Sequence, residues 1–149
     1  MIKRIAILLS LILVFMYARS QHSKTDSLYK AFSKATEDTV RVNILNELYK
    51  EYQFNDPEKA LKFSLQALKL AEKINFPKGT ASSLNNIGFY YYNQDSGSKA
   101  LVYFSKANDI FTQIENNRGI AIVNANIGNL FYSQGNYKKA HRHRNAFCL

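Results

Sequence analysis

The chain has 149 residues, with 20 Lys and Arg against 11 Asp and Glu, which gives a formal net charge of +9. Hydrophobic residues at 46% and charged residues at 21% exclude a wholly disordered or collagen-like chain. The one cysteine, Cys148, excludes an intramolecular disulfide framework and a cysteine-based zinc site.

Residues 1–20 have the three-part pattern of a secretory signal peptide. Lys3 and Arg4 precede an apolar run over residues 5–17, and Ala18-Arg19-Ser20 supplies small residues for cleavage before Gln21. A transmembrane anchor is the alternative, but this run is shorter than the about 20 residues that span a bilayer. We therefore expect a periplasmic or secreted protein with no stable membrane anchor after cleavage.

Residues 21–39 predict an N-terminal capping helix and a lead-in to the segment that follows. Its apolar positions share one helical face and its lysines lie on the other: Leu28, Ala31, Phe32 and Ala35 against Lys30 and Lys34. The open end of a repeat array needs a cover, and we expect this helix to supply it.

From residue 40 the chain repeats itself with a period of 40 residues. Four sets of residues stand in this register: Asn46, Asn86 and Asn126; Tyr52, Tyr92 and Tyr132; Lys59, Lys99 and Lys139; Ala60, Ala100 and Ala140. We divide the segment into repeat 1 (40–79), repeat 2 (80–119) and a partial repeat 3 (120–140). Apolar residues at spacings of three and four on both sides of a polar turn predict two helices in each repeat, and so an all-α fold.

The residues at the turns predict where these helices begin and end. Asp56, Ser96 and Asn136 share one register position and are preferred N-caps. Gly79 and Gly119 are expected in the left-handed conformation that closes a helix, with Pro77 discouraging extension of the first one.

The stretch from Gly128 to Ala140 has the spacing G-x-x-[YF]-x-x-x-G-x-[YF]-x-x-A and resembles the tetratricopeptide repeat. The resemblance implies a right-handed helical-hairpin solenoid of two full repeats, a truncated third and the capping helix. Repeat 2 departs from the pattern, because Asp95 and Gly97 replace the turn glycine and the aromatic residue. The array is similar to the exported sensory segment of some bacterial histidine kinases and transcriptional regulators.

The pattern breaks after Ala140, where residues 141–149 form an anomalous basic tail. We interpret this break as a frameshift or truncation, so that a remnant of a longer signalling protein without independent function is the alternative. We expect the first helix of repeat 3 to lack its partner, which predicts marginal stability or self-association through the incomplete repeat. The side chains expected to be exposed in part are Ile120, Ile127, Leu130 and Phe131.

Catalytic or cofactor chemistry is not indicated. The chain has no nucleophile or phosphate-binding signature, so we predict neither an enzyme nor a cofactor. His141 and His143 alternate with arginines and make an incomplete metal site, so no metal is expected. The aromatic run 90–92 could stack on nucleic acid, but aromatic residues pack between helices in the family it resembles, and we expect no nucleic-acid partner.

The resemblance implies that the first helix of each repeat lines a concave face that binds a protein or peptide, as a scaffold or as a sensory segment. Asn and Tyr side chains there suit an extended peptide or a helix. Leu45, Tyr49 and Ile122 stand where chaperone-binding members need lysine or asparagine, so acidic C-terminal peptides are not the expected ligands. The predicted partner contacts are Tyr49, Tyr52, Gln53, Asn85, Phe89, Tyr92, Asn93, Asn129 and Tyr132.

Overall fold

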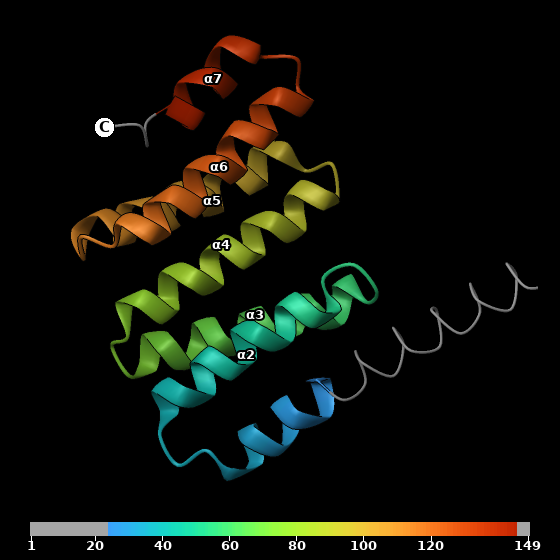
Figure 1. Cartoon of the computed structure of the whole chain (residues 1–149), viewed down its shortest axis with the longest axis vertical. Coiled ribbons are helices and arrows are strands. Elements are labelled where there is room, and N and C mark those ends of the chain that lie inside the picture. Colours follow the sequence, from blue (N-terminus) through green and yellow to red (C-terminus); the bar gives the residue numbers. More distant parts are fainter. Residues whose placement is uncertain (1–23, 146–149) are drawn as a thin grey trace, which may run out of the picture.

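The computed structural model describes residues 24–145, and all regular structure within this range is helical. The predicted signal peptide and the last four residues of the predicted tail lie outside the described residues. Residues 24–34 are helical, and six further helices follow (Figure 1): α2 (Asp38–Tyr52), α3 (Pro57–Lys73), α4 (Pro77–Asn93), α5 (Gly97–Gln113), α6 (Asn117–Ser133) and α7 (Tyr137–Asn145).

Consecutive helices pair as hairpins, α2 with α3, α4 with α5 and α6 with α7, and the hairpins stack along the long axis of the molecule (Figure 1). The first helices also contact one another, α2 with α4 and α4 with α6. The all-α helical-repeat architecture predicted from the 40-residue period is therefore confirmed. No helix in residues 24–145 is both long and apolar enough to cross a bilayer.

The helix ends differ from the prediction. Gly79 and Gly119 do not close helices; each is the third residue of its helix, and Pro77 begins α4. Proline is favoured at this first position because its missing N–H has no partner there in any helix. The left-handed conformation belongs instead to the residues two places before the helix starts: Asn75, Asp95 and Glu115 at φ of 53° to 54°, and Gly135 at 74°.

The predicted N-caps are confirmed in part. Asp56 Oδ1 accepts a hydrogen bond from the Lys59 backbone N–H at 3.1 Å, and Asn136 Oδ1 accepts one from the Lys139 N–H at 3.2 Å. Ser96 holds the N-cap position of α5, but its side chain makes no capping hydrogen bond. Its hydroxyl donates to the Gln94 carbonyl at 3.4 Å instead.

The helix over residues 24–34 covers the N-terminal end of the array, as predicted (Figure 1). Phe32 packs against the buried cluster of Val42, Leu45, Ala67 and Ala71. The ring of Tyr29 contacts the ring of Phe63 edge-on at 6.4 Å between centroids. This helix therefore closes the apolar end of the first hairpin.

The first helix of repeat 3 has a partner, and the expectation that it would lack one is wrong. Helix α7 continues past Ala140 to Asn145 and packs on α6. Ile127 and Leu130 are consequently only 5% and 3% exposed, so the exposure predicted for these two does not occur. Ile120 and Phe131 are half-buried, which agrees with the partial exposure expected for them.

His143 and Arg144 hold the places that Tyr103 and Phe104 hold one repeat earlier. The His143 imidazole stacks on Phe131 at 5.6 Å between ring centroids, and its Nδ1 lies 3.1 Å from Asn124 Oδ1. Polar side chains with flat or flexible apolar parts thus replace the aromatic residues of the earlier hairpin.

Candidate functional site

The predicted partner contacts differ in their exposure. Tyr49 is only 2% exposed, and burial raises the pKa of its hydroxyl, which has no hydrogen-bond partner among the described residues. Its ring therefore belongs to the core of the first hairpin, and its prediction as a partner contact does not fit this burial.

Tyr52 and Gln53 are half-buried at the end of α2. The ring of Tyr52 packs against Phe63 at 5.6 Å, the Lys59 ammonium lies 3.9 Å from its centroid, and its hydroxyl is 3.3 Å from the Tyr29 hydroxyl. Tyr52 is thus engaged with the N-terminal helix, while the Gln53 amide donates to the Lys50 carbonyl at 3.2 Å.

Aromatic side chains also meet near the ends of the other first helices. Phe89 contacts Phe54 at 6.3 Å and Tyr92 at 5.9 Å, and Tyr132 contacts Tyr137 edge-on at 5.2 Å. Phe54 is 73% exposed and Tyr132 is 62% exposed. Of the remaining predicted contacts, Asn93 and Asn129 are exposed and Asn85 is half-buried.

A groove of about 360 Å³ runs between α2, α4 and α6, with α5 closing it behind. Four asparagines, one serine and three charged side chains share it with two apolar ones. Its lining residues are Asn43, Asn46, Glu47, Lys50, Lys78, Ser82, Asn85, Asn86, Phe111 and Ile122. Asn85 is the one predicted partner contact among them.

A hydrogen-bond network fixes the amide of Asn46 in this groove. Its Oδ1 accepts from Asn86 Nδ2 at 2.9 Å and from the Ser83 hydroxyl at 3.1 Å. Asn46 is 7% exposed, and its Nδ2 has no hydrogen-bond partner among the described residues. A buried donor without a partner costs roughly 1–3 kcal/mol. An acceptor from outside reaches this nitrogen only once the side chains that cover it move aside.

A second asparagine pair continues the arrangement, because Asn126 Nδ2 donates to Asn85 Oδ1 at 2.9 Å. Asn46, Asn86 and Asn126 are the set with the 40-residue period, so the repeat itself places one amide from each first helix along the same face. Neither Asn46 nor Asn86 was among the predicted contacts, although this register could have identified both.

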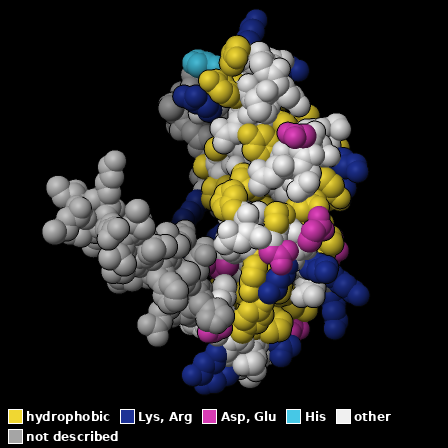
Figure 2. Space-filling view, turned by 90° about the vertical axis from the view of Figure 1, so that its right-hand side faces the viewer, with side chains coloured by type: hydrophobic (Ala, Val, Ile, Leu, Met, Phe, Trp, Pro, Cys, Tyr) yellow, Lys and Arg dark blue, Asp and Glu magenta, His cyan; other side chains and the backbone are white. Residues whose placement is uncertain are grey.

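The charges at the groove are few and mostly paired. Lys50 Nζ donates to Glu47 Oε1 at 2.6 Å, and Lys78 is an exposed cation on the opposite wall. Elsewhere, Figure 2 shows acidic and basic side chains interspersed on one face of the molecule, with a histidine at the end formed by α7. The part of the chain that the structure describes contains no group of three His, Cys, Asp or Glu side chains placed to hold a metal ion.

A second cavity, of about 400 Å³, lies between the turn of the α4–α5 hairpin and the C-terminal end of α6. Tyr92 and Asn93 line it and were predicted as partner contacts, whereas the other lining residues were not: Asp95, Gly97, Leu130, Ser133 and Gln134. Three of the predicted contacts thus lie at two separate hollows with different chemistry, Asn85 at one and Tyr92 and Asn93 at the other.

The repeated hairpins, with polar hollows along their first helices, define a tetratricopeptide-like helical repeat. Residues 79–145 match the model of the tetratricopeptide repeat family. No curated protein sequence matches the chain. Domains built from this repeat are generally modules for protein–protein interaction.

Several solved structures share the fold. The crystal structure of BtubC (BKLC) from P. vanneervenii aligns with a TM-score of 0.68 and 19% identity, covering 88% of this chain and 55% of that one. The tetratricopeptide repeat domain of Arabidopsis FLU aligns with a TM-score of 0.66 and 20% identity, covering 75% of this chain and 95% of that domain. The chain thus spans about half the length of BtubC, and at these identities the likeness shows the fold alone.

Proposed function

We propose that this chain is a peptide-binding module and that the groove between α2, α4 and α6 holds the main chain of an extended peptide. The observation that carries the proposal is the Asn46 amide, which lies at the groove, is buried and is oriented by two hydrogen bonds. Its Nδ2 has no hydrogen-bond partner among the described residues, and a peptide gains this donor when the side chains covering it move aside. A peptide carbonyl is the acceptor that matches it. Side-chain amides both donate and accept, as peptide groups do, so the neighbouring asparagines suit the same main chain.

The proposal favours main-chain recognition over recognition of a charged terminus. A carboxylate ligand is held best by unpaired cations, but Lys50 is engaged with Glu47, and Lys78 is the cation that lines the groove from the other wall. Phe111 and Ile122 add apolar area for an uncharged side chain.

The test is a selection from a random peptide library against the folded protein, followed by affinity measurement for an enriched peptide. Asn46→Asp keeps the oxygen that accepts from Asn86 and Ser83 but replaces the free donor with a carboxylate oxygen, which repels a carbonyl. We expect a loss of affinity of tenfold or more, the scale of one buried hydrogen bond.

Asn117→Asp is the matched control, because it adds the same charge on an exposed position at the start of α6, where an acidic side chain is tolerated. We expect this variant to bind as the wild type does. Equal affinity of wild type and Asn46→Asp, or no peptide enriched over the Asn46→Asp bait, would overturn the proposal.

We also propose that the module is exported and acts as the sensory segment of a signalling system. The basic start, apolar centre and small-residue cleavage site of residues 1–20 support export. Fusing residues 1–30 to a leaderless alkaline phosphatase tests it, because this enzyme becomes active only after export. Activity that Leu11→Arg abolishes is expected, and an inactive unmodified fusion would contradict export.

A further inference from the structure

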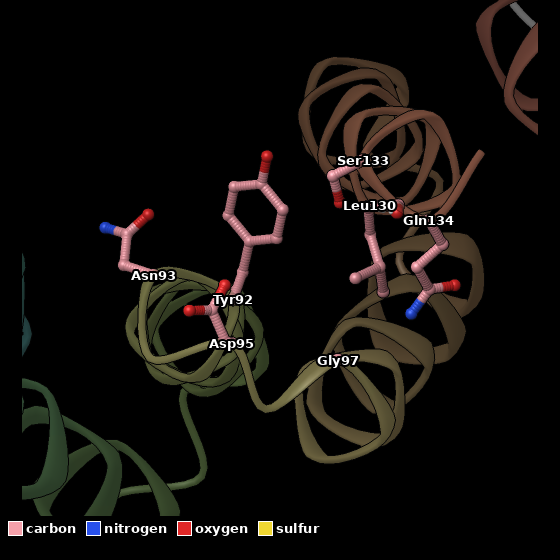
Figure 3. A pocket seen from close by; sticks show the side chains of 7 residues that line it. All are labelled: Tyr92, Asn93, Asp95, Gly97, Leu130, Ser133 and Gln134. Atoms are coloured by element: carbon pink, nitrogen blue, oxygen red, sulfur yellow. Dashed lines mark hydrogen bonds between the residues drawn. The ribbon is translucent and has the colours of Figure 1, made fainter.

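The cavity between the α4–α5 turn and α6 is a slot with two unlike walls (Figure 3). The ring of Tyr92 forms one wall, and Leu130, Ser133 and Gln134 face it from α6 across the open space. Gly97 lies between them at the base of the slot. Since a glycine projects nothing into this space, the width of the slot depends on residue 97.

The 40-residue register shows which side chain this slot lacks. Gly97 corresponds to Tyr137, and Tyr92 corresponds to Tyr132. In repeat 3 these two tyrosines meet edge-on, with centroids 5.2 Å apart and an interplanar angle of 69°. In repeat 2 the same position beside Tyr92 carries no ring, and a cavity of about 400 Å³ occupies the neighbourhood.

We propose that this slot receives a tyrosine side chain from the bound peptide. The incoming ring would pack edge-on against Tyr92, as Tyr137 packs against Tyr132, and its other face would contact Leu130. Edge-to-face aromatic pairs are favourable beyond the area they bury. The assignment of the tyrosine to a peptide rests on the proposed function.

The lining of the slot selects tyrosine over phenylalanine. In Figure 3 the Asp95 carboxylate lies at the foot of the Tyr92 side chain, and the Gln134 amide lies on the opposite side of the slot, above Gly97. The hydroxyl of a tyrosine inserted to the base would approach these groups. Both side chains accept hydrogen bonds, and the Gln134 amide also donates. Both side chains are exposed to solvent, so a phenyl ring would only forgo the hydrogen bond that a tyrosine hydroxyl makes with them.

The experiment uses p-cresol, the small-molecule analogue of the tyrosine side chain, as the probe. Toluene, which lacks the hydroxyl, is the comparison compound. We expect p-cresol to shift the backbone amide resonances of Gly97, Ser133 and Gln134 in a saturable nuclear magnetic resonance titration. Toluene should bind at least about fivefold more weakly, because it lacks one hydrogen bond. Equal binding of the two, or shifts confined to other parts of the molecule, would overturn the proposal.

Gly97→Tyr supplies the ring from the chain itself and should abolish p-cresol binding. Residue 97 begins α5 as Tyr137 begins α7, so tyrosine suits the helix start, but its Cβ would displace the ends of the Gln134 and Leu130 side chains. Gly97→Ala is the control: its Cβ would lie 2.6 Å from Gln134 Nε2 and 3.0 Å from Leu130 Cδ1, so the ends of both side chains must shift. It brings no ring into the slot and should keep binding. Undiminished p-cresol binding to Gly97→Tyr refutes the slot.

Tyr92→Ala removes the aromatic wall at a half-buried position and tests the slot independently if Gly97→Tyr fails to fold. Persistent p-cresol binding to this variant would also refute the proposal. The Asn46→Asp variant separates the two hypotheses, because it should lose the peptide and still bind p-cresol. Peptide binding without p-cresol binding would leave the groove intact and reject only the slot.

Discussion

Gly88 and Phe104 hold the two helices of repeat 2 together by close approach. A Cβ built on Gly88 would lie 2.6 Å from Cδ1 and 2.7 Å from Cε1 of the Phe104 ring, which is fully buried. One repeat later Gly128 faces the flexible side chain of Arg144, with Cγ at 3.3 Å. Two glycines in the same register therefore meet very different neighbours.

We predict opposite effects for alanine at these two positions. Gly88→Ala should destabilise the protein by about 1–3 kcal/mol, because Phe104 must move within a packed core. Gly128→Ala should be neutral or stabilising by up to about 1 kcal/mol, because the Arg144 side chain can yield and alanine is the better helix former. Urea unfolding followed by circular dichroism measures both, and equal changes would contradict this assignment.

The periodicity of the sequence was sufficient to predict the fold but not the helix ends. Alanine and glycine at positions such as 88 and 100 recur at the right spacing for two helices in close contact. Gly79 was misassigned because a glycine can either end a helix or admit a neighbour, and Pro77 fits both a helix end and a helix start. The structure decides this, because a Cβ on Gly79 would lie 2.7 Å from Val42 Cγ1.

The candidate site was predictable only where the repeat itself places it. Asn46 and Asn86 can be identified as groove residues from their shared position in the 40-residue repeat. Tyr49 looks equally suited to contact a partner in the sequence, and only the packing in the structure shows that it is buried. The slot beside Tyr92 depends on two segments, around Gly97 and Gln134, that meet only in the folded chain. The periodicity of residues within one helix does not show which distant segments come into contact when the chain folds.

The residues with a left-handed backbone conformation, two places before the helix starts, allow a prediction about stability. Glu115 has φ of 54° and is exposed, whereas Gly135 holds the corresponding place at 74° before α7. The left-handed backbone conformation costs a residue with a side chain about 1–2 kcal/mol relative to the right-handed one. Glu115→Gly should therefore stabilise the protein by about 1 kcal/mol. Gly135→Ala should destabilise it by a similar amount. Thermal unfolding of both variants checks the pair, and a loss of stability in Glu115→Gly would contradict it.

The N-terminal helix should detach without unfolding the array. Tyr29 links it to Tyr52 and Phe63, and Lys24 pairs with Glu51 at 2.5 Å. On the side of the N-terminal helix the Tyr29 and Lys24 side chains are exposed, whereas their partners in the array are half-buried. We predict that Tyr29→Ala removes the hydrogen-exchange protection of residues 24–34 and leaves that of α4 and α5 unchanged. Tyr29→Phe keeps the ring and should keep most of the protection. Loss of protection throughout the chain would show that the helix is integral to the fold.

Helix α7 should loosen in mild acid because of His143. Burial, with a smaller contribution from Arg142, lowers the pKa of His143 below its usual 6.5. The unfolded chain then binds the proton more readily, so the stability from this group is complete above about pH 6.5 and falls as pH drops toward the lowered pKa. His143→Phe keeps a ring on Phe131 but cannot titrate, so its free energy of unfolding should fall less than that of the wild type between pH 7.5 and 5. Arg142→Gln should fall by an intermediate amount, and identical pH dependence in all three proteins would show that His143 is not the titrating group.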